Sequence, residues 1–182
     1  TLVSEGSKEA EQLRKDVEFA LGRAADAADL LPMLHRLSRT ANPGSEENVF
    51  AHRQLAELLV EKDPWRAALH ARTVLSVHPE DDKAWAVLAL SQTLLNHFKY
   101  AAEAYRNALK CTPKNPWYAH NLGHLLDVAL GRPEEALQWL RSAYTRKPKH
   151  AEIVASYVHA LARSGQLTEA KRILSVAMKN EG

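Results

Sequence analysis

The chain has 182 residues, of which 46% are hydrophobic and 25% are charged, and its formal net charge at pH 7 is +2. These values are typical of one soluble globular unit, and the lack of any run of about 18 apolar residues excludes a membrane-spanning helix. The single cysteine, Cys111, excludes an internal disulfide and is expected to be a small buried hydrophobe. One cysteine and no signal or transmembrane segment favour the cytoplasm without fixing the location.

Residues 1–47 are expected to form two helices that serve as an N-terminal cap or a degenerate repeat, with a regulatory arm as the alternative. Ser7 is expected to cap a first helix that ends near Ala28, and Asp29 a second helix with Pro32 in its first turn. The sequence Asn-Pro-Gly-Ser at 42–45 then separates this segment from a more regular one.

Residues 48–182 carry an internal repeat of 34 or 35 residues. The recurring markers are Pro79, Pro113 and Pro148, and Ala67, Ala101, Ala136 and Ala170. Apolar residues at intervals of three or four precede and follow each marker alanine, so each unit is predicted to be helix, turn, helix. The predicted units are about 48–81, 82–115, 116–150 and 151–182.

The repeat resembles the tetratricopeptide repeat, whose first helix carries Trp, Leu, Gly and Tyr and whose second carries Ala, an aromatic residue and a terminal Pro. The second unit matches best, through Trp85, Leu88, Ala89, Ala101, Tyr105, Ala108 and Pro113. The third unit has one extra residue near Gly131. The resemblance implies an all-α fold, a right-handed α-solenoid of antiparallel helix pairs, in which Trp85 belongs to the core.

The resemblance also implies a function, that of a protein-interaction scaffold or adaptor that binds a peptide or partner protein in a concave groove. The family's groove positions select Phe50, Arg53, Lys83, Leu90, Trp117, His120, Asn121, His124, Asp127, His159 and Arg163. Trp117 is expected to anchor the partner, or else to pack against the preceding repeat, and Asn121 to contact the partner or to hydrogen-bond within the groove. The family's clamp for acidic chaperone tails is not expected, because only Asn121 matches it.

Charge gives no sign of a nucleic-acid partner. Residues 1–109 carry 13 basic and 16 acidic side chains, and residues 110–182 carry 11 and 6. The densest basic cluster comprises Arg146, Lys147, Lys149 and His150. This cluster is expected in a loop, without stacking aromatics or a reader motif, so neither nucleic-acid binding nor membrane insertion is predicted.

No catalytic motif is found, and neither an enzyme activity nor a cofactor is expected. His120, His124 and Asp127 are spaced to share one helix face and are the candidate metal ligands, but no cysteine pair or HExxH sequence supports them, so no metal is predicted. Two alternatives to groove binding remain. One is a histidine-based interaction domain that responds to metal or pH, and the other is self-assembly by stacking through an uncapped C-terminal end.

Overall fold

The computed structural model describes residues 4–181, which form ten α-helices and one π-helical turn and contain no strand. The elements are α1 (Glu5–Gly22), α2 (Ala27–Thr40), α3 (Glu46–Leu59), α4 (Pro64–Val77), α5 (Asp82–Leu94), α6 (Phe98–Cys111), α7 (Pro116–His124), η1 (Leu125–Ala129), α8 (Pro133–Arg146), α9 (Ala151–Arg163) and α10 (Leu167–Asn180). The all-α prediction is confirmed. Within residues 4–181, no helix is both long and apolar enough to cross a membrane.

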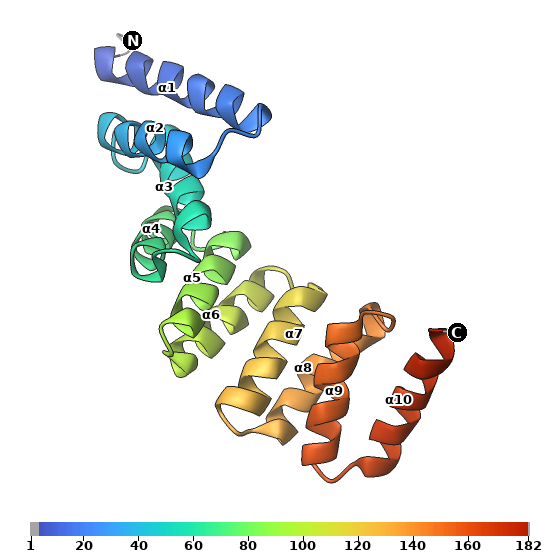
Figure 1. The fold of residues 1–182 in the computed structure, drawn as a ribbon. Helices are drawn as coiled ribbons and strands as arrows, with labels where there is room; N and C mark the ends of the chain where they lie inside the picture. Colours follow the sequence, from blue (N-terminus) through green and yellow to red (C-terminus); the bar gives the residue numbers. More distant parts are fainter. Residues whose placement is uncertain (1–3, 182) are drawn as a thin grey trace. The chain divides into compact units, whose positions relative to one another are not determined.

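Successive helices are joined by short turns and divide into two compact units, Thr1–Leu95 with α1 to α5 and Asn96–Gly182 with α6 to α10 (Figure 1). The boundary falls inside the predicted repeat 82–115, between its two helices.

The two N-terminal helices begin earlier than expected. Ser4 rather than Ser7 caps α1, because the Ser4 hydroxyl accepts a hydrogen bond from the Ser7 main-chain N–H at 3.3 Å. Asp26 rather than Asp29 precedes α2, in extended backbone conformation. As a result, Pro32 lies inside α2 instead of in its first turn, at the loss of one helical hydrogen bond.

In the first unit, α1, α2, α3 and α4 share an apolar core. Val17 of α1, Leu34 and Leu37 of α2 and Leu55 of α3 are fully buried in it, together with Ala67 of α4. Burying each of these larger side chains contributes about 1.5–3 kcal/mol to folding. The two N-terminal helices are therefore part of a continuous packed unit with the first predicted repeat.

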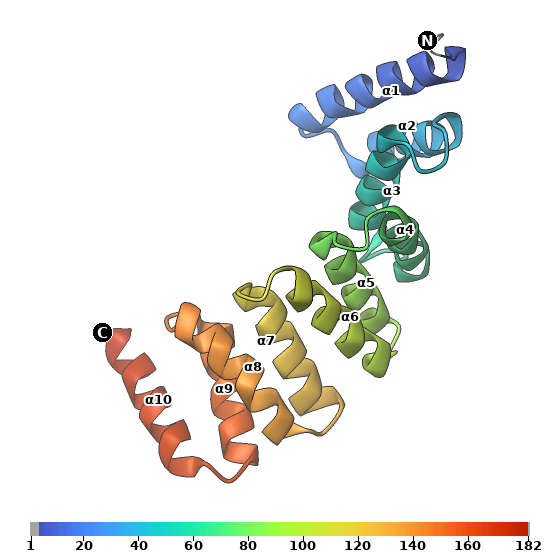
Figure 2. The ribbon, with the colours of Figure 1, turned by 180° about the vertical axis from the view of Figure 1, so that it is seen from behind.

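In the second unit, α9 packs against α8 on one side and α10 on the other (Figure 2). Leu122 of α7, Leu140 of α8 and Leu161 of α9 are fully buried between the helices. The close approach of α7 and α8 depends on Gly123, because a Cβ added there would lie 2.5 Å from Leu140 Cγ. A small residue at this position is therefore a steric requirement.

The extra residue of the third predicted repeat takes the form of a π-helical turn, η1, directly after α7. Its signature is the main-chain N–H of Leu130 donating to the carbonyl of Leu125, five residues back, at 3.1 Å. One residue inserted into an α-helix produces such a turn. The insertion thus lies in 125–129, slightly before Gly131 where the sequence suggested it, and it places Asp127 at the centre of the turn.

Two side chains that were expected in the interior are only partly buried. Trp85 lies at the start of α5, where its indole N–H donates to the carbonyl of Pro79 at 2.8 Å. This hydrogen bond keeps the indole nitrogen near the solvated end of the helix, because the acceptor is in the preceding turn. Cys111, at the last position of α6, is also only partly buried.

Candidate functional site

Seven of the eleven predicted partner-binding residues lie in the second unit, and contacts between α7, η1 and α9 bring most of them together. We call this surface the α7/α9 face. It consists of Trp117, His120, Asn121 and His124 of α7, Asp127 of η1, and Ser156, His159 and Arg163 of α9. Residues three or four apart share one side of a helix, which explains why these positions line up.

Asp127 is the centre of the face and is almost completely buried, with 1% of its surface exposed. One carboxylate oxygen accepts a hydrogen bond from Arg163 Nη1 at 2.9 Å, and the other lies 2.5 Å from His159 Nδ1. Arg163 Nη1 also donates to the main-chain carbonyl of Asp127 at 2.7 Å. Because a buried carboxylate is costly unless paired, these contacts fix the orientation of both α9 side chains.

A second polar network joins α7 to α9 through Ser156. The hydroxyl of Ser156 lies 2.8 Å from His120 Nε2 and 3.5 Å from His124 Nδ1. Burial, and then the charge of nearby His124, lower the pKa of His120. His120 is therefore neutral at pH 7 and can act as donor or acceptor towards Ser156.

Asn121 is exposed, and its side chain is hydrogen-bonded to the hydroxyl of Tyr105 on α6. Burial raises the pKa of Tyr105, which stays a neutral phenol. This contact links Asn121 to the preceding helix. A carboxamide has two N–H donors and a carbonyl oxygen with two lone pairs, so the contact leaves further bonding capacity.

Trp117 stands at the N-terminal end of the face with 42% of its surface exposed. The indole meets the ring of His150 edge-on, with centroids 4.8 Å apart, and Lys147 Nζ lies 5.9 Å from the ring. Both partners belong to the basic loop 147–150, which was predicted to be a solvent-exposed loop. One edge of Trp117 is therefore supported by the loop that ends its own repeat, while the rest of the ring is open.

The candidate metal ligands do not form a three-ligand site. Asp127 is bonded to His159 and Arg163, whereas His120 and His124 share Ser156. Across residues 4–181, no group of three or more His, Cys, Asp or Glu side chains is placed to hold a metal ion.

The other four predicted residues lie in the first unit, where two already have partners. Phe50 packs against the apolar core, and its ring lies 4.6 Å from the Arg14 guanidinium. Arg53 forms an ion pair with Asp81 at 2.6 Å. The remaining two residues, Lys83 and Leu90, are exposed.

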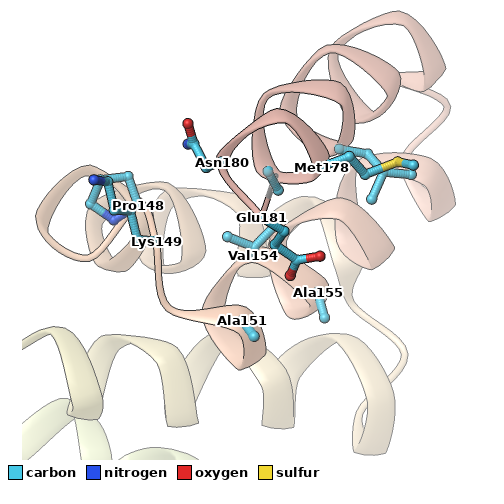
Figure 3. Close-up of a pocket in the computed structure, with 10 residues that line it drawn as sticks. Pro148, Lys149, Ala151, Val154, Ala155, Met178, Asn180 and Glu181 are labelled. Atoms are coloured by element: carbon cyan, nitrogen blue, oxygen red, sulfur yellow. The ribbon is translucent and has the colours of Figure 1, made fainter.

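A separate apolar surface lies at the C-terminal end of the second unit. A pocket of about 260 Å³ opens between α9, α10 and the loop 147–150 (Figure 3). Its apolar side chains are Pro148, Ala151, Val154, Ala155, Leu174, Ala177 and Met178. Leu174 is 46% exposed, whereas Leu140, at the same position one repeat earlier, is fully buried. The surface of α10 is thus the uncovered counterpart of the α8 surface on which α9 packs.

Comparison with known families agrees with this geometry. Residues 127–181 match one tetratricopeptide-repeat model, and residues 104–138 match a second. The chain therefore carries tetratricopeptide repeats within residues 104–181. The sequence matches no curated protein.

Three solved structures share the fold. MamA 41-end from Desulfovibrio magneticus RS-1 is 16% identical with a TM-score of 0.82, over 99% of this chain and 97% of that one. MamA AMB-1 is 19% identical with a TM-score of 0.77, over 96% and 93%. A tetratricopeptide repeat protein from Parabacteroides merdae ATCC 43184 is 16% identical with a TM-score of 0.80, over 96% and 67%. At these identities the likeness establishes the fold alone.

Proposed function

We propose that this tetratricopeptide-repeat chain is a protein-interaction scaffold, and that the α7/α9 face of its second unit binds a segment of a partner protein. The observation that carries the proposal is the buried Asp127, which holds Arg163 and His159 side by side at the surface. A buried carboxylate that orients two exposed polar side chains is well suited to recognition.

The chemistry of the face suits a polypeptide ligand. Trp117 offers an open aromatic surface, and aromatic anchors contribute most to peptide affinity when they are already held in place. Arg163 and Asn121 keep donors that can read main-chain carbonyls of an extended segment. Because the networks around Asp127 and Ser156 hold the face in order, little conformational entropy is lost on binding.

A pull-down compares the wild-type chain with a Trp117→Ala, Asn121→Ala double variant whose helicity and melting temperature are unchanged. We expect the double variant to lose a partner that the wild-type chain retains. Trp65→Ala is the matched control, because Trp65 is 58% exposed but lies on α4 of the first unit. Equal recovery of every partner by the double variant would contradict the proposal.

A second candidate function is self-association through the C-terminal end, which the pocket beside α10 favours. Met178 is 66% exposed and lines this pocket with Leu174 (Figure 3). Apolar surfaces of this kind are typical of interaction sites, and two copies facing each other through the same patch would bury it in a two-fold dimer.

Sedimentation at increasing concentration tests the second candidate. The wild-type chain should shift to twice its monomer mass, and a Leu174→Ser, Met178→Ser variant should remain a monomer. Leu167→Ser is the control, because Leu167 is exposed on α10 but does not line the pocket. A wild-type chain that stays monomeric at high concentration would rule out this function.

A further inference from the structure

Three histidines from three consecutive helices meet in the first unit, away from the α7/α9 face. They are His35 of α2, His52 of α3 and His70 of α4, and all three are partly buried. The Nδ1 atoms of His52 and His70 lie 2.8 Å apart, and their ring centroids are separated by 5.1 Å. The ring of His35 is 6.2 Å from that of His70. We call these residues the histidine cluster.

The contact between His52 and His70 limits how many protons the cluster can hold. At 2.8 Å one Nδ1 must donate and the other must accept. A first added proton leaves one imidazolium that donates to one neutral imidazole. A second added proton places N–H groups on both facing atoms, so the hydrogen bond is lost and two like charges face each other.

The surroundings of the pair also oppose protonation. The charged or titratable groups that act on His70 are His52 of α3, His35 of α2 and Arg66 of its own helix, each of which is cationic or becomes so. Burial is the largest cause and, with these groups, lowers the pKa of His70 to about 4. Burial and His35 also lower the pKa of His52. No carboxylate is among these groups to compensate a new positive charge.

We propose that the histidine cluster is a proton-sensitive contact that keeps α3 packed on α4 at neutral pH and loosens this packing when the cluster takes up protons. The location supports a conformational effect. Leu55 of α3 and Ala67 of α4 are fully buried in the same core, so separation of α3 from α4 would expose that core.

The direction of the pH dependence follows from the two states. In an unfolded chain a histidine has its ordinary pKa of about 6.5, whereas His70 in the folded unit has a pKa of about 4. Between these values the unfolded chain binds more protons, so the packing is strongest above pH 6.5 and weakens as the pH falls towards 4. The opening constant should rise up to about tenfold per pH unit for each proton taken up.

The first experiment follows the imidazole Cε1–H signals of the full chain by NMR from pH 7.5 to pH 4. His70 should titrate well below the ordinary range. Because the two rings are coupled, the titration curve of His52 should extend over a wider pH range than that of an isolated histidine. Ordinary titration near pH 6.5 for both residues would overturn the proposal, and this measurement needs no variant to fold.

The second experiment measures amide hydrogen-exchange protection in α3 and α4 at pH 7, 6 and 5. In the wild-type chain, the protection factors should decrease as the pH is lowered from 7 to 5. In the His70→Gln variant, they should depend less on pH. His78→Gln is the matched control, because His78 is in the same unit but faces Glu46 and Glu80. If His70→Gln retains the wild-type slope, the cluster does not control the packing.

Discussion

The Arg163 guanidinium reaches Asp127, 36 residues earlier in the chain, and donates from one nitrogen to both its carboxylate and its main-chain carbonyl. This contact ties α9 to the π-helical turn that follows α7. The contact forms because the π-helical turn made by the extra residue of the third repeat turns the Asp127 side chain inward. There it lies beside Arg163 and His159 of α9. The same contact stabilises the second unit and orders its proposed binding surface.

Removing Arg163 should therefore weaken the second unit. Arg163→Ala leaves the buried carboxylate of Asp127 with His159 alone, and we expect it to lower the free energy of unfolding by about 2–3 kcal/mol. Urea denaturation measures this change. Arg172→Ala is the matched control, because Arg172 pairs on the surface with Glu169 and should have little effect. Equal losses in the two variants would contradict the role given to Asp127.

A methyl group at Gly123 should destabilise the contact between α7 and α8. Its carbon would lie 2.5 Å from Leu140 Cγ and 3.3 Å from the carbonyl oxygen of Ala136, and Leu140 has no room to move because it is fully buried. We expect Gly123→Ala to lower the free energy of unfolding by about 1–3 kcal/mol. Gly22→Ala, where the added carbon would meet nothing within 4 Å beyond the neighbouring backbone of its own helix, should be neutral or stabilising in the same thermal or urea melts.

Asp81 has two roles that substitution can separate. One carboxylate oxygen accepts from the main-chain N–H of Ala84 and caps α5, and the other pairs with Arg53. Asp81→Asn keeps the cap and removes the charge, whereas Asp81→Ala removes both. We expect Asp81→Ala to lower the free energy of unfolding by about 1–2 kcal/mol and Asp81→Asn to lower it by less. Equal melting temperatures for the two variants would show that the cap adds nothing.

Trp117 should contribute little to stability, which is the behaviour expected of a residue kept for binding. Its contacts with His150 and Lys147 lie on an exposed ring, so Trp117→Ala should lower the free energy of unfolding by at most about 1 kcal/mol. Leu122→Ala, at a fully buried position of the same helix, should cost about 2–5 kcal/mol. A loss of similar size for Trp117 would indicate a mainly structural role.

The repeat period was sufficient to predict the fold of the chain, because Pro113, Pro148 and the marker alanines recur in phase with the buried faces of the helices. The π-helical turn was visible only as one extra residue. Where the turn forms depends on the packing of α8 and α9 against it, and the repeat pattern carries no information on that packing. The observed N-cap residues of α1 and α2 lie three positions before the predicted ones. Ser4 and Ser7 are equally suitable as caps, and so are Asp26 and Asp29, so the sequence could not distinguish them.

The candidate site was predictable in part. Helical spacing brought His120, Asn121 and His124 to one surface, but the pairing of Asp127 with His159 and Arg163 required the inward turn at η1. The histidine cluster was missed although a signal exists. Its members are 17 and 18 residues apart, half the repeat period, and such spacing places side chains at matching levels of consecutive helices.

The most direct test of the proposed interaction is a hydrogen-exchange footprint of the full chain with and without a partner recovered by the pull-down. We expect slowed exchange in α7, η1 and α9, centred on the turns that carry Asn121, Asp127 and Arg163, and loss of this footprint in the Trp117→Ala, Asn121→Ala variant. Protection confined to α6 and α8, to α10, or to the first unit would contradict it.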